Sequence, residues 1–281
     1  MDIRLIATDL DGTLLREDKS VSVYTKYILK LAADDGIPVA IATGRPLMAI
    51  PENLLAMDCF RYAITSNGAS VYDLKTGERL MERMLSRDAV LRILEAIPED
   101  ICIETLVDGI PYGPEQYVRD AGLFGLNESG AAYIRRTRRP VSDIRAFIFG
   151  NADRLDCINA VPPSALRAED LRARLSGIPG IYITHSGVTF IEISGTTHGK
   201  GEGLLFLSGL LKTGPESVMV FGDAENDRDL FRAAGYSVAV ENAAPALIRE
   251  ADALTLSNEQ DGVAVKIAEL FGYPGPEEMI Q

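Results

Sequence analysis

A short apolar run near the N-terminus ends in two aspartates, and this arrangement limits the folds open to the chain. Leu5, Ile6 and Ala7 form the run, and Asp9 and Asp11 follow it. An apolar run of this length, bounded by polar residues, is typical of a strand buried in a parallel sheet. Ligands bind at the carboxyl ends of the strands in open α/β sheets. Asp9 is therefore expected at a ligand-binding edge, where packing does not require a carboxylate.

The two aspartates predict a cation site. Asp11 shares Asp9's side of an extended backbone, because strand side chains repeat with a period of two. Two like charges so close are costly unless a cation, a proton or a hydrogen-bond network compensates them. Mg²⁺ prefers oxygen ligands and fits the pair. Gly12 lets the backbone leave the strand sharply, and Thr13 can offer a hydroxyl or an amide to an anion. An Asp-Gly pair is also common in plain turns, so this stretch alone leaves a structural alternative open.

Two further apolar runs also end in polar residues. Residues 37–42 lead into Thr43 and Gly44, whose hydroxyl and amide can hold a phosphate-like anion, with a plain turn as the alternative. Residues 218–221 lead into Asp223, Asn226 and Asp227. If the three strands lie side by side in one parallel sheet, the three polar clusters meet at one edge.

The combined clusters predict a site for a metal ion and a phosphate. Asp9 and Asp223 can hold Mg²⁺, which neutralises phosphate charge. Lys200 adds a fixed positive charge to the same edge. Without its metal such a site is highly acidic, so metal and anionic substrate are expected to bind together.

Composition narrows the possible partners. The 281 residues suffice for one large domain or two ordinary ones. A formal charge of −13 argues against a nucleic acid or an anionic membrane as partner. A basic leader before an apolar core and a membrane-length apolar window are both absent from the sequence, so we expect a cytoplasmic protein. Three widely spaced cysteines fit buried free thiols rather than a zinc site or a disulfide framework; they are Cys59, Cys102 and Cys157.

The middle of the chain has a different pattern of predicted elements, with strands that pair through hairpins rather than in βαβ repeats. This pattern predicts a separate α+β domain. We expect a helix over residues 88–96, a hairpin around Asp108 and Gly109, and strands at 144–149 and 181–193 flanking a helix at 168–175. The predicted division is a core of residues 1–83 and 194–281 with an inserted domain of residues 84–193. After the insert, helices and strands alternate again, and Lys200 is expected to precede a helix over residues 203–211.

Two features of this region leave alternatives open. A cluster of arginines is either a solvated face or a contact for an anionic substrate; its members are Arg135, Arg136, Arg138 and Arg139. His198, near Lys200, is read first as a loop residue and second as a substrate contact. His185 and His198 lack the spacing of metal ligands.

Taken together, the motifs resemble those of haloacid dehalogenase superfamily phosphatases, and more closely those of the Cof-type branch, which carries a large inserted cap domain. The resemblance extends over essentially the whole chain in motif order. The corresponding segments are Asp9-Leu-Asp11-Gly-Thr13, Thr43-Gly-Arg, Lys200, Gly222-Asp223-Ala-Glu-Asn226-Asp227 and Asn258-Glu-Gln-Asp261-Gly-Val-Ala. It implies a doubly wound parallel-sheet (Rossmann-like) α/β core with an inserted α+β cap that supplies substrate specificity.

The resemblance also implies roles for individual residues. Asp9 would be the nucleophile that becomes an aspartyl phosphate, and Asp11 the general acid and base. The carboxylates of Asp9 and Asp223, with the backbone carbonyl of Asp11, would bind Mg²⁺. The phosphoryl group would be bound by Thr43, Gly44, Lys200 and Asn226. Asp227 would orient Lys200 or the outer shell of the metal.

The expected activity is Mg²⁺-dependent hydrolysis of a small phosphomonoester. Sugar phosphates and the phosphorylated ribityl-aminouracil intermediate of riboflavin synthesis are typical substrates of such proteins, and nothing in this sequence selects among them. A phosphotransferase or mutase of the phosphomannomutase type would share the motifs. A non-catalytic sensor of a phosphorylated metabolite is a further alternative, but binding alone does not need a second acid beside the nucleophile. Oligomeric state and regulation are not predicted.

Overall fold

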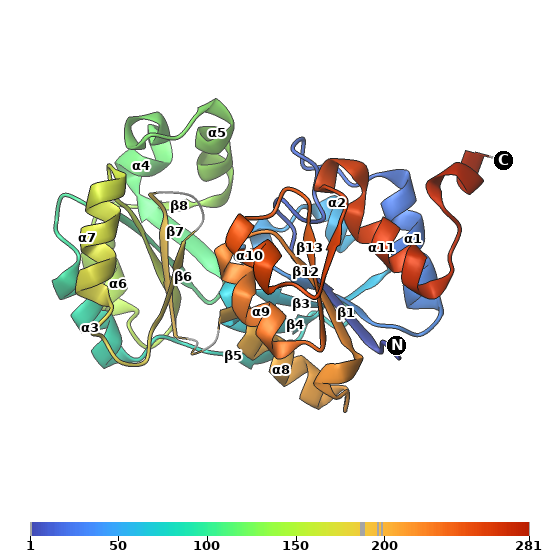
Figure 1. The fold of residues 1–281 in the computed structure, drawn as a ribbon. Helices are drawn as coiled ribbons and strands as arrows, with labels where there is room; N and C mark the ends of the chain where they lie inside the picture. The colour runs from blue at the N-terminus through green and yellow to red at the C-terminus, as the bar shows by residue number, and fades with distance from the viewer. Residues whose placement is uncertain (1, 186–188, 196, 198, 281) are drawn as a thin grey trace. The chain divides into compact units, whose positions relative to one another are not determined.

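The computed structural model describes residues 2–185, 189–195, 197 and 199–280 (Figure 1). Its residues group into two compact units. The first consists of Met1–Gly44, Ile50–Met81 and Lys200–Gln281, and the second of Arg45–Ala49 and Glu82–Gly199. Three separate segments of the chain therefore build the first unit, while the second is almost continuous in sequence.

The first unit is built on an eight-stranded sheet with the strand order β14-β13-β12-β1-β2-β3-β4-β5. The strands from β14 to β3 pair in parallel, and β4 pairs with β3 in the antiparallel sense. The strand bounds are β1 (Leu5–Thr8), β2 (Val39–Ala42), β3 (Phe60–Thr65), β4 (Ser70–Asp73), β5 (Arg79–Glu82), β12 (Val218–Gly222), β13 (Tyr236–Val240) and β14 (Ala253–Thr255).

Helices cover both faces of this sheet. One face packs against α8, α9 and α10 through a shared apolar core, and Figure 1 shows α1 and α11 on the other face. Every residue of β1, β2 and β12 is buried, as expected for parallel strands covered on both sides. The helix bounds are α1 (Val23–Asp34), α2 (Glu52–Leu55), α8 (Gly199–Leu210), α9 (Arg228–Ala233), α10 (Pro245–Glu250) and α11 (Gly262–Phe271).

The strand order places the polar clusters together. β1 lies between β2 and β12, with Ala7 opposite Ala40 on one side and Val220 on the other. From β1 the chain continues outward through β2 and β3, and it returns on the opposite side through β12, β13 and β14. Such a reversal of strand order forms a crevice at the carboxyl ends of the strands. The predicted doubly wound parallel core is confirmed.

The second unit contains a six-stranded sheet with the order β10-β11-β9-β6-β7-β8. The hairpin expected around Asp108 and Gly109 is present, since β6 pairs antiparallel with β7. Helices α3, α6 and α7 pack on one face of the sheet. The elements are α3 (Arg87–Ala96), β6 (Cys102–Val107), β7 (Ile110–Pro114), α4 (Glu115–Arg119), α5 (Glu128–Thr137), β8 (Arg139–Val141), α6 (Ile144–Gly150), β9 (Leu155–Val161), α7 (Ala165–Leu175), β10 (Tyr182–His185) and β11 (Ile191–Ser194).

The strand predicted over residues 144–149 is wrong, because the chain forms helix α6 there. Asp143 caps the helix by accepting a hydrogen bond from the amide of Ala146 at 2.9 Å. Ile144, Phe147 and Ile148 share one helical face and pack into the core of the second unit. Periodicity cannot separate a strand from a helix in so short an apolar run. The central strand β9 lies just beyond it and was not predicted.

Other local predictions also need correction. Lys200 lies inside the first turn of α8 and does not precede the helix. Arg138 is buried, whereas Arg135, Arg136 and Arg139 are exposed, so the solvated-face interpretation fails for one member of the arginine cluster.

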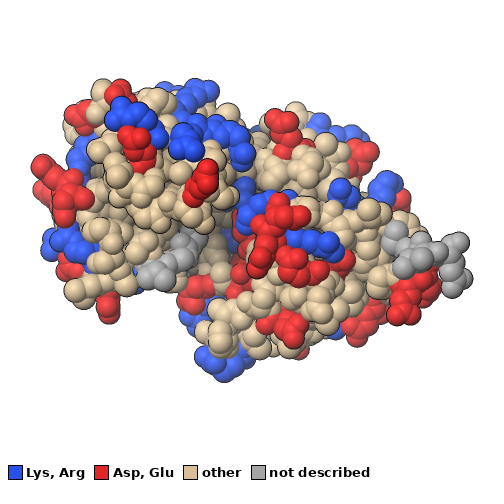
Figure 2. Space-filling model, turned by 90° about the horizontal axis from the view of Figure 1, so that it is seen from above, with Lys and Arg blue, Asp and Glu red and all other residues tan. Residues whose placement is uncertain are grey.

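In the part of the chain described here, no helix combines the length and apolarity that crossing a membrane requires. Figure 2 shows acidic and basic side chains interspersed over the visible face.

Candidate active site

Asp9 lies directly after β1 and is 5% exposed. Its amide donates to the carbonyl of Phe221 at 3.1 Å, which continues the pairing of β1 with β12 by one residue. Its carboxylate Oδ1 accepts a hydrogen bond from Lys200 Nζ at 2.6 Å. The strand therefore delivers a buried carboxylate to the carboxyl edge of the sheet and pairs it there with an ammonium group.

Asp227 connects Lys200 to the loop that follows β12. Its Oδ1 accepts from Lys200 Nζ at 2.7 Å, and its Oδ2 accepts from the backbone amides of Asp223 and Ala224 at 3.0 and 3.1 Å. Gly222 ends β12, and a Cβ placed there would lie 2.6 Å from Asp227 Cβ, so the loop needs glycine at this position. Asp227 thus positions both the lysine and the backbone that carries Asp223.

Lys200 is 0% exposed and has a carboxylate on each side. Burial alone would lower the pKa of its ammonium, but the attraction of Asp227 and Asp9 outweighs burial and raises that pKa above its ordinary value. Lys200 therefore stays protonated at neutral pH. A buried charge is tolerated only when it is paired and hydrogen-bonded, and this site meets both conditions.

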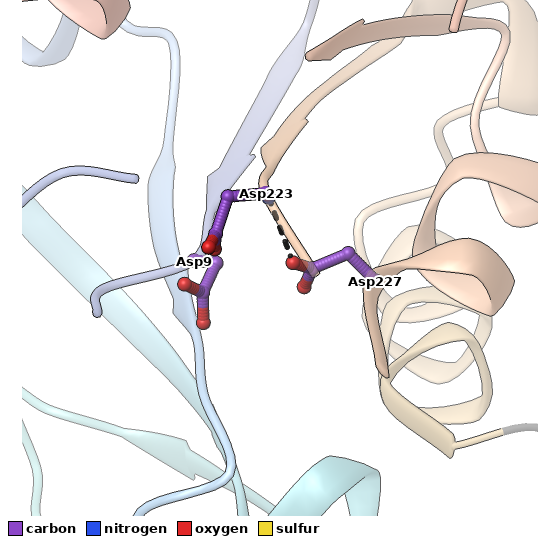
Figure 3. Close-up of side chains that lie close together, drawn as sticks. All are labelled: Asp9, Asp223 and Asp227. Atoms are coloured by element: carbon purple, nitrogen blue, oxygen red, sulfur yellow. Dashed lines mark hydrogen bonds between the residues drawn. The ribbon is translucent and has the colours of Figure 1, made fainter. Parts of the chain in front are cut away.

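Asp9, Asp223 and Asp227 form a compact acidic group whose selected oxygens all lie within 4.8 Å of one another. Figure 3 shows the carboxylate of Asp223 reaching toward the Asp9 side chain, and the bond from the Asp223 amide to Asp227. Burial, followed by the neighbouring carboxylates, raises the pKa of Asp9 well above its ordinary value. Burial and the charge of Asp227 raise the pKa of Asp223 to about 6. The two pKa values are raised because buried carboxylates lie close together with the single ammonium of Lys200 among them.

The donor set fits a hard divalent cation. Asp227 uses both of its oxygens on Lys200 and two backbone amides, which leaves Asp9 and Asp223 as the carboxylates best able to bind a metal. Within this acidic group, three carboxylates are offset by the single ammonium of Lys200. Carboxylate oxygens are the preferred protein ligands of Mg²⁺, and a dication would balance the remaining charge.

The structure separates the Asp11 side chain from this group. Its Oδ1 accepts from Lys19 Nζ at 2.9 Å, and its side chain is 39% exposed. Asp11 therefore does not belong to the acidic group, contrary to the expected convergence of the two side chains. Gly12 turns the chain here with a φ of 83°, and a Cβ at this residue would lie 2.4 Å from Asp223 Oδ2. The Thr13 hydroxyl, expected to serve an anion, donates to Asp223 Oδ1 at 3.0 Å.

Thr43 and Asn226 lie at the same edge of the sheet. Thr43 is buried after β2, its amide donates to the carbonyl of Ile64 at 2.8 Å, and Gly44 follows it. Asn226 Nδ2 donates to Asn67 Oδ1 at 3.1 Å, and the amide of Asn67 donates to the carbonyl of Thr43 at 3.2 Å. Asn67 thus links the loops after β2 and β12.

Two asparagines that hold these loops, Asn67 and Asn242, are not among the site residues predicted from the sequence. Asn67 has a φ of 51°, a conformation that asparagine tolerates better than most residues. The Asn67-Gly68 pair is a strong turn signal in the sequence, which does not by itself reveal the contacts of the Asn67 side chain. Asn242 Nδ2 donates to the carbonyl of Gly12 at 2.7 Å and was not identified at all. Asn258, part of a recognised segment, donates from its amide to Asn242 Oδ1 at 3.0 Å. His198 lies outside the described residues.

Comparison with known proteins gives a consistent result. Residues 6–267 match the model of the haloacid dehalogenase-like hydrolase family. The chain is 27% identical over 292 residues to the 5-amino-6-(5-phospho-D-ribitylamino)uracil phosphatase YwtE of Bacillus subtilis, with 96% of this chain and 98% of the relative covered. It is 28% identical over 278 residues to YitU of B. subtilis, which is also named a 5-amino-6-(5-phospho-D-ribitylamino)uracil phosphatase, with 95% of this chain and 97% of the relative covered. A haloacid dehalogenase-like hydrolase structure from B. subtilis aligns with a TM-score of 0.82 at 25% identity, covering 95% of this chain and 100% of that one.

Proposed function

The chain belongs to the haloacid dehalogenase-like hydrolase family and is a phosphoric monoester hydrolase, and we propose that it hydrolyses a small phosphomonoester through an aspartyl phosphate on Asp9. The observation that carries this proposal is the buried arrangement of Asp9, Lys200 and Asp227 beside Asp223. Such a group is costly to assemble, and perturbed carboxyl and ammonium pKa values are typical of catalytic sites.

Asp9 is the proposed nucleophile. Lys200 holds its Oδ1, so Oδ2 is the oxygen that attacks phosphorus. The new bond joins Oδ2 to phosphorus, and the bond from phosphorus to the leaving alcohol oxygen breaks. Water then attacks the aspartyl phosphate, releases inorganic phosphate and restores the carboxylate. Dividing one difficult displacement between two steps lowers the barrier of each.

Asp11 is the proposed general acid and base. It donates a proton to the leaving alcohol oxygen in the first step and removes a proton from the attacking water in the second. Its partial exposure and its bond to Lys19 mean that the carboxyl group must leave Lys19 to do this. Because surface ion pairs contribute little free energy, breaking this contact costs little.

The residues proposed to bind the transferring phosphoryl group are Lys200, Thr43, Gly44 and Asn226. An ammonium has three N–H donors, and among the described residues Lys200 donates two of them to Asp9 and Asp227. The third can bind a phosphoryl oxygen. The hydroxyl of Thr43, the amide of Gly44 and the carboxamide of Asn226 supply neutral donors. Fixed donors of this kind stabilise the charge that develops during transfer.

Asp9, Asp223 and the backbone carbonyl of Asp11 are the proposed ligands of Mg²⁺. When bound, the metal neutralises phosphate charge and orients the substrate for displacement. The chain's own contribution is to hold the two carboxylates close together and to fix Asp223 through the Thr13 hydroxyl at 3.0 Å.

The second unit is the proposed cap that selects the substrate, and residues 84–193 are its expected bounds. Relatives named as phosphatases of a ribitylamino-uracil phosphate suggest a phosphate ester of a polyhydroxylated alcohol. A sugar or polyol phosphate is therefore the preferred substrate class. The site needs no nucleic acid or membrane, and we place the enzyme in the cytoplasm.

The test is release of inorganic phosphate from a panel of small phosphomonoesters, with and without Mg²⁺. Metal-dependent release is expected from wild type, and Asp9→Asn is expected to lower it at least about a thousandfold. Asp88→Asn is the matched control, since the Asp88 side chain is 70% exposed on α3. Substantial turnover by Asp9→Asn would exclude Asp9 as the nucleophile. Phosphate transfer to a sugar hydroxyl with little release would instead identify a mutase.

A further inference from the structure

The loop after β13, residues 241–244, contacts two loops of the candidate active site. Asn242 Nδ2 donates to the carbonyl of Gly12, in the loop after β1, at 2.7 Å. The amide of Ala244 donates to the carbonyl of Asp223, directly after β12, at 2.7 Å. Because β12 lies between β13 and β1 in the sheet, this loop reaches across one strand. It therefore joins the backbone of Gly12 to that of Asp223.

Gly12 needs an outside contact to hold its conformation. Its φ is 83°, and a Cβ at this residue would lie 2.4 Å from Asp223 Oδ2, so the close approach requires glycine. Glycine, however, restricts the backbone less than any other residue does. The turn that follows Asp11 is therefore not fixed by steric hindrance at Gly12, and hydrogen bonds to the turn must restrict it instead.

Both ends of the Asn242 carboxamide are fixed. Its Nδ2 donates to the Gly12 carbonyl, and its Oδ1 accepts from the amide of Asn258 at 3.0 Å. Because the carboxamide oxygen can only accept and the nitrogen can only donate, the reversed orientation would lose both bonds. Asn258 is 8% exposed, and its own Nδ2 donates to the carbonyl of Leu15 at 2.8 Å. A buried neighbour thus holds the exposed Asn242 side chain in place.

The peptide that Asn242 holds lies between two groups of the proposed metal site. The backbone carbonyl of Asp11, a proposed ligand, precedes Gly12. Thr13 follows Gly12, and its hydroxyl donates to Asp223 Oδ1 at 3.0 Å. The Gly12 carbonyl belongs to the peptide that joins Gly12 to Thr13, so fixing this carbonyl limits the movement of both neighbours. Releasing it would let the Asp11 carbonyl and the Asp223 carboxylate move relative to each other.

We propose that Asn242 is a positioning residue for Mg²⁺ binding, because its bond to the Gly12 carbonyl sets the Asp11 carbonyl against the Asp223 carboxylate. This inference rests on the proposed function. Mg²⁺ demands near-ideal octahedral geometry and tolerates little displacement of its ligands. Residues that orient metal ligands typically contribute about 10–100-fold to metal affinity. Asn242 acts through Gly12 and is assigned no contact with the metal or the substrate.

The test compares substitutions of Asn242 with the same substitutions of Asn151. Asn151 is the matched control, because its Nδ2 donates to the carbonyl of Phe147 at 2.9 Å at the end of α6, in the second unit. At each position, alanine removes one bond from a carboxamide to a backbone carbonyl. Aspartate removes the same bond while keeping the shape of the side chain, since its oxygens cannot donate when ionised.

The quantity measured is the Kd of Mg²⁺, obtained from the rise in Tm as MgCl₂ is added to protein first freed of metal with EDTA. Asn242→Ala and Asn242→Asp are each expected to raise this Kd about tenfold, whereas Asn151→Ala and Asn151→Asp should leave it unchanged. The charge of Asn242→Asp alone would attract the cation and lower the Kd. An unchanged or lower Kd in either Asn242 variant would therefore overturn the proposal.

Phosphate release gives a second readout that a purely structural role would not change. With an ester that wild type hydrolyses, Asn242→Ala should need about tenfold more Mg²⁺ for half-maximal release. At saturating Mg²⁺, its kcat and its KM for the ester should approach those of wild type. A lower Tm of the metal-free variant with an unchanged dependence on Mg²⁺ would show that Asn242 supports only the fold, and would overturn the proposal.

The outcomes separate this inference from the proposed function. If Mg²⁺ does not raise the Tm of wild type, the proposed metal site fails and the role of Asn242 fails with it. If Mg²⁺ stabilises wild type and both Asn242 variants with the same Kd, only the role of Asn242 fails. Thermal unfolding needs no substrate, so it decides the role of Asn242 even when no ester of the panel is hydrolysed.

Discussion

The Asp227 carboxylate uses both of its oxygens within the protein. One accepts from Lys200 at 2.7 Å, and the other accepts from the amides of Asp223 and Ala224 at 3.0 and 3.1 Å. These bonds connect the ammonium beside Asp9, the proposed nucleophile, to the backbone of Asp223. Asp227 therefore acts as a positioning residue for both.

Asp227→Asn tests this role. An asparagine has one oxygen and cannot accept from both Lys200 and the two amides, so we expect kcat to fall about tenfold to a hundredfold. KM should change less, because Lys200 still pairs with Asp9. Asp88→Asn, which removes an exposed carboxylate, is the control. Unchanged kcat in Asp227→Asn would show that Lys200 is positioned by Asp9 alone.

Asp223 predicts an unusual dependence of stability on pH in EDTA. Burial and Asp227 raise its pKa from 3.8 to about 6 in the folded chain, so its ionised form destabilises the fold. This penalty is complete above about pH 6 and is relieved as the pH falls toward the ordinary value near 4. Asp223→Asn should therefore be more stable than wild type near neutral pH, by on the order of 1 kcal/mol.

The measurement is the free energy of unfolding of wild type and Asp223→Asn at several pH values in EDTA. The difference between the two proteins should shrink as the pH falls through about 6. Using the difference removes the contributions of the many other titrating groups. A difference that is constant with pH would mean that Asp223 carries no raised pKa.

At the scale of elements, the sequence predicted strands well where an apolar run ended in polar residues. The strands β1, β2 and β12 are confirmed, because their side chains are buried on both faces and the resulting runs are easy to identify. Prediction failed where local pattern and tertiary context disagree. The run Ile144–Gly150 reads equally well as strand or helix, and its N-cap, Asp143, decided for the helix.

The same limit applies to single side chains. Arg138 follows α5 in a cluster of arginines, and nothing in the local pattern distinguishes it from its exposed neighbours. Its burial depends on Glu104, which lies thirty-four residues earlier in the chain and is fully buried. Similarly, Asn159 and Thr184 become neighbours of Glu192 only through strand pairing. Long-range register is what the sequence alone could not supply.

The Arg138–Glu104 pair predicts strong coupling between two elements of the second unit. The side chains are 7% and 0% exposed, so removing one partner leaves a buried charge. Arg138→Met should destabilise the protein by about 3–5 kcal/mol. Adding Glu104→Leu should recover at least half of this loss, because two apolar side chains can replace a buried ion pair.

A double-mutant cycle followed by chemical denaturation would measure the coupling. Arg92→Met is the control, since the Arg92–Asp88 pair is exposed on α3 and should contribute less than about 1 kcal/mol. Additive effects of the Arg138 and Glu104 substitutions would contradict the buried pair.

For the whole molecule, the order of motifs was the informative feature. Asp9, Thr43 and Asp223 follow strands that the doubly wound topology brings side by side, so the site could be anticipated before any contact was known. No rule of this kind locates a site in the second unit, because its polar residues lie within strands rather than at the carboxyl ends of strands. The core of the site was therefore predictable, while the side-chain contacts inside the second unit, such as that of Arg138 with Glu104, were not.

The proposed metal site lies wholly within the first unit, and this predicts how Mg²⁺ affects unfolding. A ligand that binds only the folded state stabilises it, by about 2.7 kcal/mol at one hundred times Kd. Mg²⁺ should therefore raise the Tm of the transition in which the first unit unfolds, increasingly with concentration.

The gain should be lost in Asp223→Asn, which removes a ligand, and kept in Asp88→Asn, which removes the same charge from an exposed helix. If the units unfold separately, a transition of the second unit should not move. An equal gain in Asp223→Asn and wild type would mean that Mg²⁺ acts on the general acidic surface, because only binding at the Asp9–Asp223 pair depends on that carboxylate.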